Sequence, residues 1–192
     1  MVLRRELDRC LADDQTLSSV HAYWMSKMPS EGLPTRDSIE PSDIKGLLPN
    51  VGLIDVLDGG ENFRYRLIGT GMVNVFGRDF TGVTLGEAHK DGEYGRFLHK
   101  LYGEAVSTRG AVYCESRFVY TSDRNMLIRR LLMPLAGPDG DVEMLFFSNT
   151  FDWSLHPTLV TSGSTELGMN FPSEEIKEIV PLRRAYGNPA AA

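Results

Sequence analysis

A glycine-rich step in the first half of the chain is the clearest candidate for ligand chemistry. Residues 63–82 read FRYRLIGTGMVNVFGRDFTG and place Gly69-Thr70-Gly71 between an apolar run and a short helical pattern. A turn of this kind can bind phosphate through its backbone N–H groups. A dinucleotide site also needs a third glycine and parallel strands, and neither is indicated here. We therefore expect a corner in which Thr70 caps a short helix that ends at Gly77.

Metal and thiol chemistry find little support. The histidine and cysteine residues have none of the spacings of a metal site: His21, His89, His99, His156, Cys10 and Cys114. No metal is expected. Two distant cysteines also give no disulfide framework, which favours a reducing cytoplasm. Cys114 lies in a predicted strand, where a small buried apolar residue is the default interpretation.

Catalytic motifs are equally scarce. The sequence contains no nucleophile elbow, no Walker lysine and no paired-carboxylate motif. We predict that the chain is not an enzyme. The competing hypothesis is an enzyme or small-molecule carrier of another small α+β ligand-binding fold.

Charge and hydropathy exclude two classes of partner. The chain has a net charge of −6 at pH 7, and its basic residues are scattered. Nucleic-acid and anionic-membrane surfaces need clustered Lys and Arg, so neither partner is expected. No stretch approaches the ~20 apolar residues of a membrane span, and no signal peptide is evident at the start. These observations predict a soluble, cytoplasmic protein.

The candidate residues are positioned by a predicted β-hairpin. Val51–Leu57 and Phe63–Ile68 flank a glycine-containing turn. Alternation along the two strands predicts one core face: Ile54, Val56, Phe63, Tyr65 and Leu67. The opposite face carries Asp55, Arg64 and Arg66, which are close enough across the ladder to form an ion pair.

The other predicted elements complete an α+β chain. A helix over Gln15–Met28 precedes a proline-containing arm, and a longer helix covers Glu93–Thr108 after a Thr84/Glu87 capping box. Three further strands are predicted at 111–121, 126–135 and 142–153. We divide the chain into an N-terminal helix and arm (1–50), a central domain (51–153) and a C-terminal extension (154–192) whose end is expected to be disordered.

The order of the predicted elements and several short sequence segments resemble a bacterial PAS-like family of small PAS domain-containing proteins. The resemblance rests on Trp24 in the leading helix, LPTRDSIEPSDIKGLLPNVGLIDV at 33–56, the stretch at 63–82 and LLMPL at 131–135. It implies a five-stranded antiparallel sheet, in the order 2-1-5-4-3, with helices on one face. It also implies a sensory or protein-interaction module in bacterial signalling, with a protein partner.

PAS domains can carry haem or flavin. A haem would need a histidine on the long helix, and His99 is the candidate, although it lies at the edge of the apolar stripe where partial exposure is the commoner outcome. A photoactive flavin would need a cysteine just after the hairpin, where the chain has Asn74, Val75 and Phe76. The flavin chemistry is therefore disfavoured, and the cofactor stays unknown.

The leading helix has two possible roles. Its apolar stripe can cover the outer face of the sheet, or it can pair with a second copy in a homodimer, as leading helices of PAS domains often do. The stripe consists of Leu17, Val20, Trp24 and Met28.

The resemblance also suggests a small apolar cavity between the sheet and the long helix, although tight packing of the same side chains is the alternative. A bound molecule would be small and organic, and without a phosphate because no basic cluster is expected there. The candidate ligand contacts are Tyr65, Met72, Phe76, Phe97, Leu101, Ser148 and Asn149.

Overall fold

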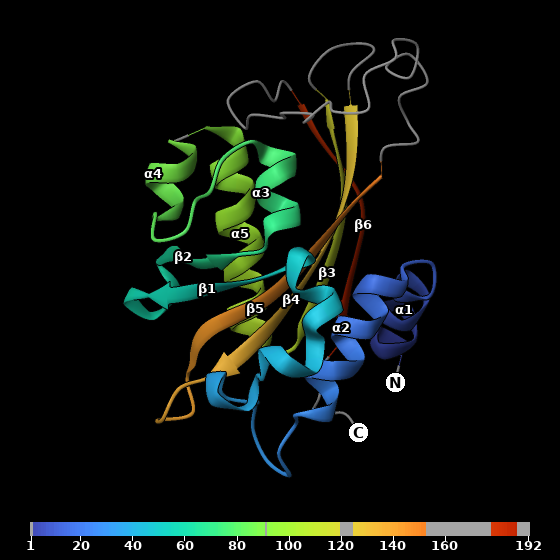
Figure 1. The fold of residues 1–192 in the computed structure, drawn as a ribbon, viewed down its shortest axis with the longest axis vertical. Helices are drawn as coiled ribbons and strands as arrows, with labels where there is room; N and C mark the ends of the chain where they lie inside the picture. Colours follow the sequence, from blue (N-terminus) through green and yellow to red (C-terminus); the bar gives the residue numbers. More distant parts are fainter. Residues whose placement is uncertain (1, 91, 120–124, 153–177, 188–192) are drawn as a thin grey trace.

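A six-stranded antiparallel sheet forms the centre of the molecule (Figure 1). The computed structural model describes residues 2–90, 92–119, 125–152 and 178–187. The strands are β1 (Val51–Leu57), β2 (Asn62–Ile68), β3 (Ala111–Val119), β4 (Asn125–Ala136), β5 (Val142–Asp152) and β6 (Glu178–Gly187). Their spatial order is β2-β1-β5-β4-β3-β6. The predicted order 2-1-5-4-3 is confirmed, with a sixth strand added at its edge.

The sixth strand corrects the predicted strand count. β6 pairs antiparallel with β3, from Ala111↔Gly187 to Val119↔Glu178, so this part of the C-terminal extension belongs to the sheet. Pro181 lies beside an irregularity in the register, which is where an edge strand tolerates a residue without an N–H group. The predicted strand ends at 120–121 and 153, and residues 154–177 and 188–192 of the C-terminal extension with its expected disordered end, lie outside the described residues.

Helices cover both faces of the sheet, whereas the sequence predicted a helical layer on one face and an N-terminal arm. α3 (Thr70–Phe76), α4 (Leu85–His89) and α5 (Glu93–Thr108) lie together on one face (Figure 1). α1 (Val2–Ala12) and α2 (Gln15–Ser26) lie on the other, with α1 against β6 and α2 against β4 and β5. The connecting arm contains 3-10 turns at Arg36–Ser38 and Pro41–Asn50, and a third follows β1 at Asp58–Gly60. Among the described residues, no helix has the length and apolar character needed to cross a bilayer.

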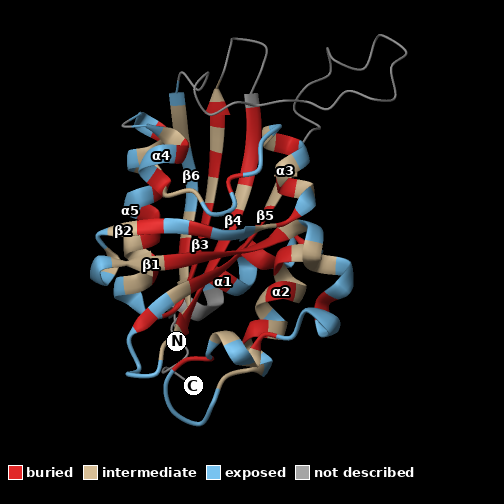
Figure 2. Cartoon of the chain, turned by 60° about the vertical axis from the view of Figure 1, so that its left-hand side comes forward, coloured by how far each residue is buried: buried red, intermediate tan, exposed pale blue. Residues whose placement is uncertain are grey.

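The apolar stripe of α2 packs against the chain's own sheet. Leu17, Val20 and Trp24 have no exposed surface, and the buried side of α2 faces the strands (Figure 2). The Trp24 Nε1–H group donates to the Pro134 carbonyl oxygen at 3.2 Å. Of the two roles considered for this stripe, covering the sheet is the one observed, and these three side chains offer no surface to a second copy. Met28 lies just beyond the helix and is half-buried.

Close packing explains the glycine step. Gly69 is the N-cap of α3, and Thr70 is the first helical residue, so the predicted capping role of Thr70 is wrong. Gly69 has φ −64, which any residue can adopt. A Cβ there would overlap the backbone oxygens of Leu48 and Pro49, and one at Gly71 would come within 2.8 Å of the Pro49 oxygen. The step therefore lets α3 lie directly on the connecting arm.

A bulge changes one predicted side-chain position. The β1–β2 register shifts between Leu53 and Ile54, so Ile54 pairs with Tyr65 but Leu53 pairs with Leu67. Leu67 consequently leaves the core face and is 45% exposed. Two local predictions are confirmed, namely the Thr84–Glu87 capping box and the span of α5. The C-cap of α5 is Arg109, which has a left-handed backbone with φ 50.

Candidate functional site

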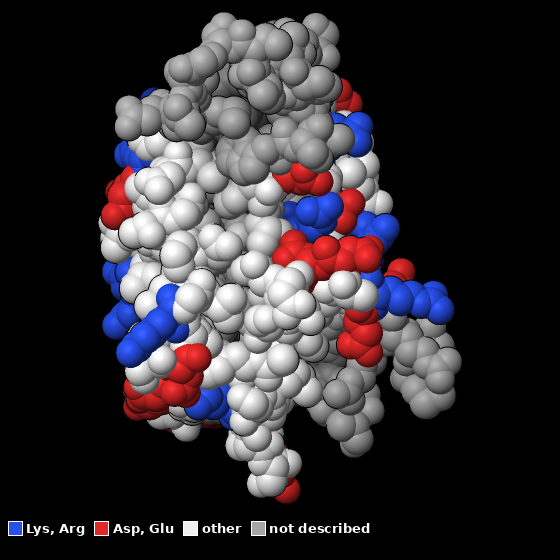
Figure 3. Space-filling model, turned by 45° about the vertical axis from the view of Figure 1, so that its right-hand side comes forward, with Lys and Arg blue, Asp and Glu red and all other residues white. Residues whose placement is uncertain are grey.

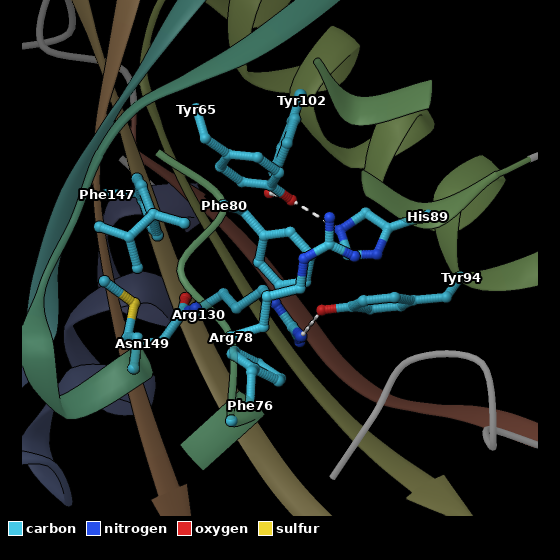
Figure 4. Close-up of a pocket in the computed structure, with 13 residues that line it drawn as sticks. Tyr65, Phe76, Arg78, Phe80, His89, Tyr94, Tyr102, Arg130, Phe147 and Asn149 are labelled. Carbon is cyan, nitrogen blue, oxygen red and sulfur yellow. Dashed lines mark hydrogen bonds between the residues drawn. The ribbon is translucent and has the colours of Figure 1, made fainter. Parts of the chain in front are cut away.

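A cavity of about 240 Å³ lies between the sheet and the α3–α5 layer (Figure 4). Its walls come from β2, β4 and β5 on the sheet side and from α3, α4 and α5 and the segment after α3 on the other. The lining residues are Tyr65, Ile68, Met72, Phe76, Gly77, Arg78, Phe80, His89, Tyr94, Tyr102, Arg130, Phe147 and Asn149. Aromatic and aliphatic side chains mixed with a few polar groups are typical of small-molecule pockets.

Four of the seven predicted ligand contacts line this cavity: Tyr65, Met72, Phe76 and Asn149. The other three lie elsewhere. Phe97 stacks edge-on against Phe118, with ring centroids 6.0 Å apart, and Leu101 is fully buried in the core. Ser148 precedes Asn149 on β5 and therefore points to the opposite face, where its hydroxyl donates to the Asn50 carbonyl oxygen at 2.9 Å.

The haem candidate His99 is also outside the cavity. Its Nε2 lies 2.9 Å from the Glu61 carbonyl oxygen and its ring packs against Phe63, so it borders a separate surface hollow. The residues present do not fit a haem bound through His99. Within the described ranges, no group of three or more His, Cys, Asp and Glu residues is arranged to hold a metal ion.

A histidine that the sequence did not single out lies at the cavity wall. His89 is the last residue of α4, and its Nε2 is 3.0 Å from the Tyr65 hydroxyl, which is 3.4 Å from the Tyr102 hydroxyl. Burial, with a further contribution from the charges of Arg130 and Arg78, lowers the pKa of His89 from 6.5 to about 4. The imidazole is therefore neutral at pH 7.

The second unforeseen group is a buried arginine. Arg130 projects from β4 and is 2% exposed, and its Nη2 donates to the Tyr94 hydroxyl at 3.0 Å (Figure 4). Together with Arg78 it gives the cavity two guanidinium groups. The expectation that no basic cluster faces this space is therefore wrong. The available signal was the adjacent pair Arg129-Arg130 in an apolar strand, because alternation sends one of two neighbours to each face.

On the outer face, Asp55 accepts hydrogen bonds from both candidate arginines. Arg64 Nη2 and Nε lie 2.8 and 3.0 Å from Asp55 Oδ2, and Arg66 Nη1 lies 3.1 Å from Oδ1. The carboxylate is 9% exposed, whereas the two arginines are 44% and 54% exposed. The two arginines can still be solvated by water if the pair is broken, whereas the buried carboxylate would lose most of its hydrogen-bond partners.

Replacing Asp55 by asparagine is expected to lower the free energy of unfolding by about 1 to 2 kcal/mol, because a buried carboxylate loses charge-assisted hydrogen bonds from partly solvated partners. Chemical denaturation at pH 7 measures this change. The control is Arg66→Gln, which removes the more exposed partner and should cost under about 1 kcal/mol. Coincident unfolding curves for Asp55→Asn and the parent would show that the pair contributes nothing.

Charges of both signs are interleaved on the face seen in Figure 3, where Lys and Arg side chains alternate with Asp and Glu. Among the ion pairs of the described residues, Arg129 Nε lies 3.5 Å from Glu115 Oε2 and Arg129 Nη2 lies 3.7 Å from Asp152 Oδ2. On this face, basic and acidic side chains therefore partly offset one another.

Solved structures give distant likenesses. The PAS domain from Bordetella pertussis BvgS is 19% identical with a TM-score of 0.43, over 56% of this chain and 79% of that one. Vibrio cholera VqmA, in a ligand–DNA complex, is 13% identical with a TM-score of 0.45, over 67% and 62%. An RNA-binding light-oxygen-voltage receptor is 16% identical with a TM-score of 0.39, over 64% and 37%. In the last two, the match spans less than two thirds of that protein.

Sequence comparison gives the stronger result. None of the curated proteins compared matches the chain. A family model described as "PAS domain" matches residues 12–147, well over half of the chain and every element from α2 to most of β5. This match assigns the chain, whose sheet contains the antiparallel order β2-β1-β5-β4-β3, to the PAS domain family.

Proposed function

We propose that this chain is a sensory module of bacterial signalling that binds a small organic molecule in the cavity under α3–α5 and reports it to a protein partner. The observation that supports this proposal is the cavity itself, a space of about 240 Å³, because protein interiors are ordinarily packed with few voids larger than a water molecule. Membership of the PAS family supports a sensory or interaction role.

The form of the cavity favours a ligand smaller than a drug-sized molecule. Its volume is below the roughly 300–1,000 Å³ of ordinary ligand pockets. Met72, Phe76 and Phe80 offer apolar contacts, while Tyr65 and Asn149 offer polar ones. A compact molecule with an apolar body and few polar groups matches this lining.

The proposal assigns no reaction to the cavity. PAS domains are typically sensory modules, and the described residues of the lining include no Ser, Thr, Cys, Lys, Asp or Glu that could act as a nucleophile or carboxylate base. The His89–Tyr65 contact can hold a ligand proton in place. We therefore retain the non-enzymatic interpretation.

We propose a cytoplasmic location and a protein partner. Cys10 and Cys114 are both free and buried, which suits a reducing compartment. Interleaved surface charge and a net charge of −6 favour a protein over a nucleic acid as the partner. A second copy of the chain is one such partner, through surfaces other than the buried side of α2. Light scattering on the intact chain measures its mass directly.

A metabolite screen by thermal shift tests the proposal. A ligand that binds only the folded state at about 100 times its dissociation constant stabilises the protein by about 2.7 kcal/mol, so a true ligand should raise the melting temperature with concentration. Mass spectrometry of protein purified from its native host identifies any molecule that is retained.

Two matched variants locate the site. Phe80→Ala removes a lining ring and should reduce the ligand-induced shift, whereas Leu101→Ala truncates a buried side chain of α5 outside the cavity and should keep it. A shift that survives Phe80→Ala but is lost in Leu101→Ala places the ligand elsewhere. If no metabolite gives a shift and none is retained, the chain is an interaction module rather than a small-molecule sensor.

A further inference from the structure

Arg130 brings a positive charge into the interior with unusually little compensation. Its guanidinium lies 4.9 Å from the ring centroid of Phe118, 5.8 Å from that of Phe97 and 5.9 Å from that of Tyr94. These cation–π contacts and the Tyr94 hydroxyl offset part of the desolvation of the charge. A buried ion ordinarily also has a counter-ion, because desolvation costs several kcal/mol per charge.

Two buried polar atoms of residues that line the cavity have no hydrogen-bond partner in the part of the chain that the structure describes. They are Nη1 of Arg130, a donor, and Oδ1 of Asn149, an acceptor. The two residues are direct cross-strand partners on β4 and β5, both line the cavity, and they are 2% and 6% exposed. Buried polar atoms are nearly always paired, so an unpaired donor and an unpaired acceptor on neighbouring strands of the cavity wall indicate complementary groups on a ligand.

The charge of the cavity indicates the sign of that ligand. Among the described residues, the lining includes Arg78 and Arg130 but no Asp or Glu. His89 is neutral at pH 7, since burial and the two arginines lower its pKa to about 4. Arg78 is exposed and stacks over the Phe80 ring at 5.0 Å, whereas Arg130 is buried more deeply. An anion would be attracted by Arg78 and would find its partner at Arg130.

We propose that the ligand is a small organic carboxylate that carries an O–H or N–H group beside the carboxylate. The carboxylate accepts from Arg130 Nη1, the neighbouring group donates to Asn149 Oδ1, and the body of the molecule packs against Met72 and Phe76. This inference rests on the proposed function and names the class of ligand for the same cavity. A phosphate is the poorer fit, because it brings up to two charges and three acceptor oxygens to a single buried guanidinium.

An internal carboxylate provides the first test. Asn149→Asp replaces the side-chain amide by a carboxylate of nearly the same shape, directly across the strands from Arg130. If Arg130 lacks an anionic partner, this variant should have a higher melting temperature than the parent without any added compound, and it should no longer respond to a carboxylate ligand. A lower melting temperature at pH 7 would overturn the proposal.

Three related probes provide the second test. Phenyllactate has both proposed groups, phenylpropanoate lacks the hydroxyl, and methyl phenyllactate lacks the charge. Thermal shifts of the parent should be largest with phenyllactate, smaller with phenylpropanoate and smallest with the ester. Arg130→Met keeps an apolar side chain in place of the buried charge, so it should fold at least as stably as the parent while losing the response to phenyllactate.

The outcomes separate this inference from the proposed function. If the ester stabilises as well as the acid, or if Arg130→Met keeps the full response, the cavity binds small molecules but not by a carboxylate. If inorganic phosphate stabilises the parent and the acids do not, the ligand class is also wrong. If none of these compounds produces a shift and the metabolite screen is empty as well, both the ligand class and the sensory function fail.

Discussion

Replacing Trp24 by alanine is expected to lower the free energy of unfolding by about 3 to 5 kcal/mol, the cost of deleting a large aromatic side chain from a packed interior. Trp24 is among the largest fully buried side chains and lies in α2, which packs against β4 and β5. The substitution leaves a cavity between these layers and removes the hydrogen bond to Pro134. Denaturant unfolding followed by circular dichroism measures the loss.

Trp24→Phe is the matched control. It keeps a ring in the site but removes the N–H donor to the Pro134 carbonyl oxygen and some volume, so it should cost about 1 to 2 kcal/mol. Neither variant is expected to change the mass measured by light scattering under native conditions, because Trp24 is fully buried within one chain. If Trp24→Ala were as stable as the parent but smaller in mass, α2 would instead belong to an interface between copies.

The regular elements could be predicted because their apolar residues repeat with a clear period. Alternating residues gave β1 to β5 within a few residues of their observed bounds, and the stripe of α5 fixed that helix over Glu93–Thr108. β6 lacks this signal. Its described residues are mostly half-buried or exposed, with Pro181 and Leu182 both at the surface, as suits an edge strand.

The cavity was predicted only in part because its walls depend on register and on a bulge. Ser148 and Asn149 were both proposed as contacts, yet neighbours on a strand face opposite sides, so only one of them could line the space. Arg129 and Arg130 obey the same rule: Arg129 lies near Glu115 and Asp152 on the outer face, and Arg130 enters the interior. The pairing of Arg130 with Asn149 follows from the β4–β5 register, which the alternation of apolar and polar residues does not specify.

Acid is expected to destabilise the ligand-free protein through His89. Its folded-state pKa of about 4 lies below the 6.5 of an ordinary histidine, so the unfolded chain binds a proton first as the pH falls. This stabilisation is complete above pH 6.5 and is lost as the pH falls from 6.5 to 4. A difference of about 2.5 pKa units corresponds to about 3 kcal/mol.

Comparison with His89→Gln isolates this contribution, because both proteins carry the same carboxylates. The free energy of unfolding, measured by denaturation between pH 7 and pH 4, should fall by about 3 kcal/mol more in the parent than in the variant. Parallel pH profiles would show that His89 is not held in its neutral form. Arg130→Met separates the two causes that lower the pKa of His89. Because burial is the larger cause, this variant should keep most of the pH dependence of stability and lose only the part due to the Arg130 charge.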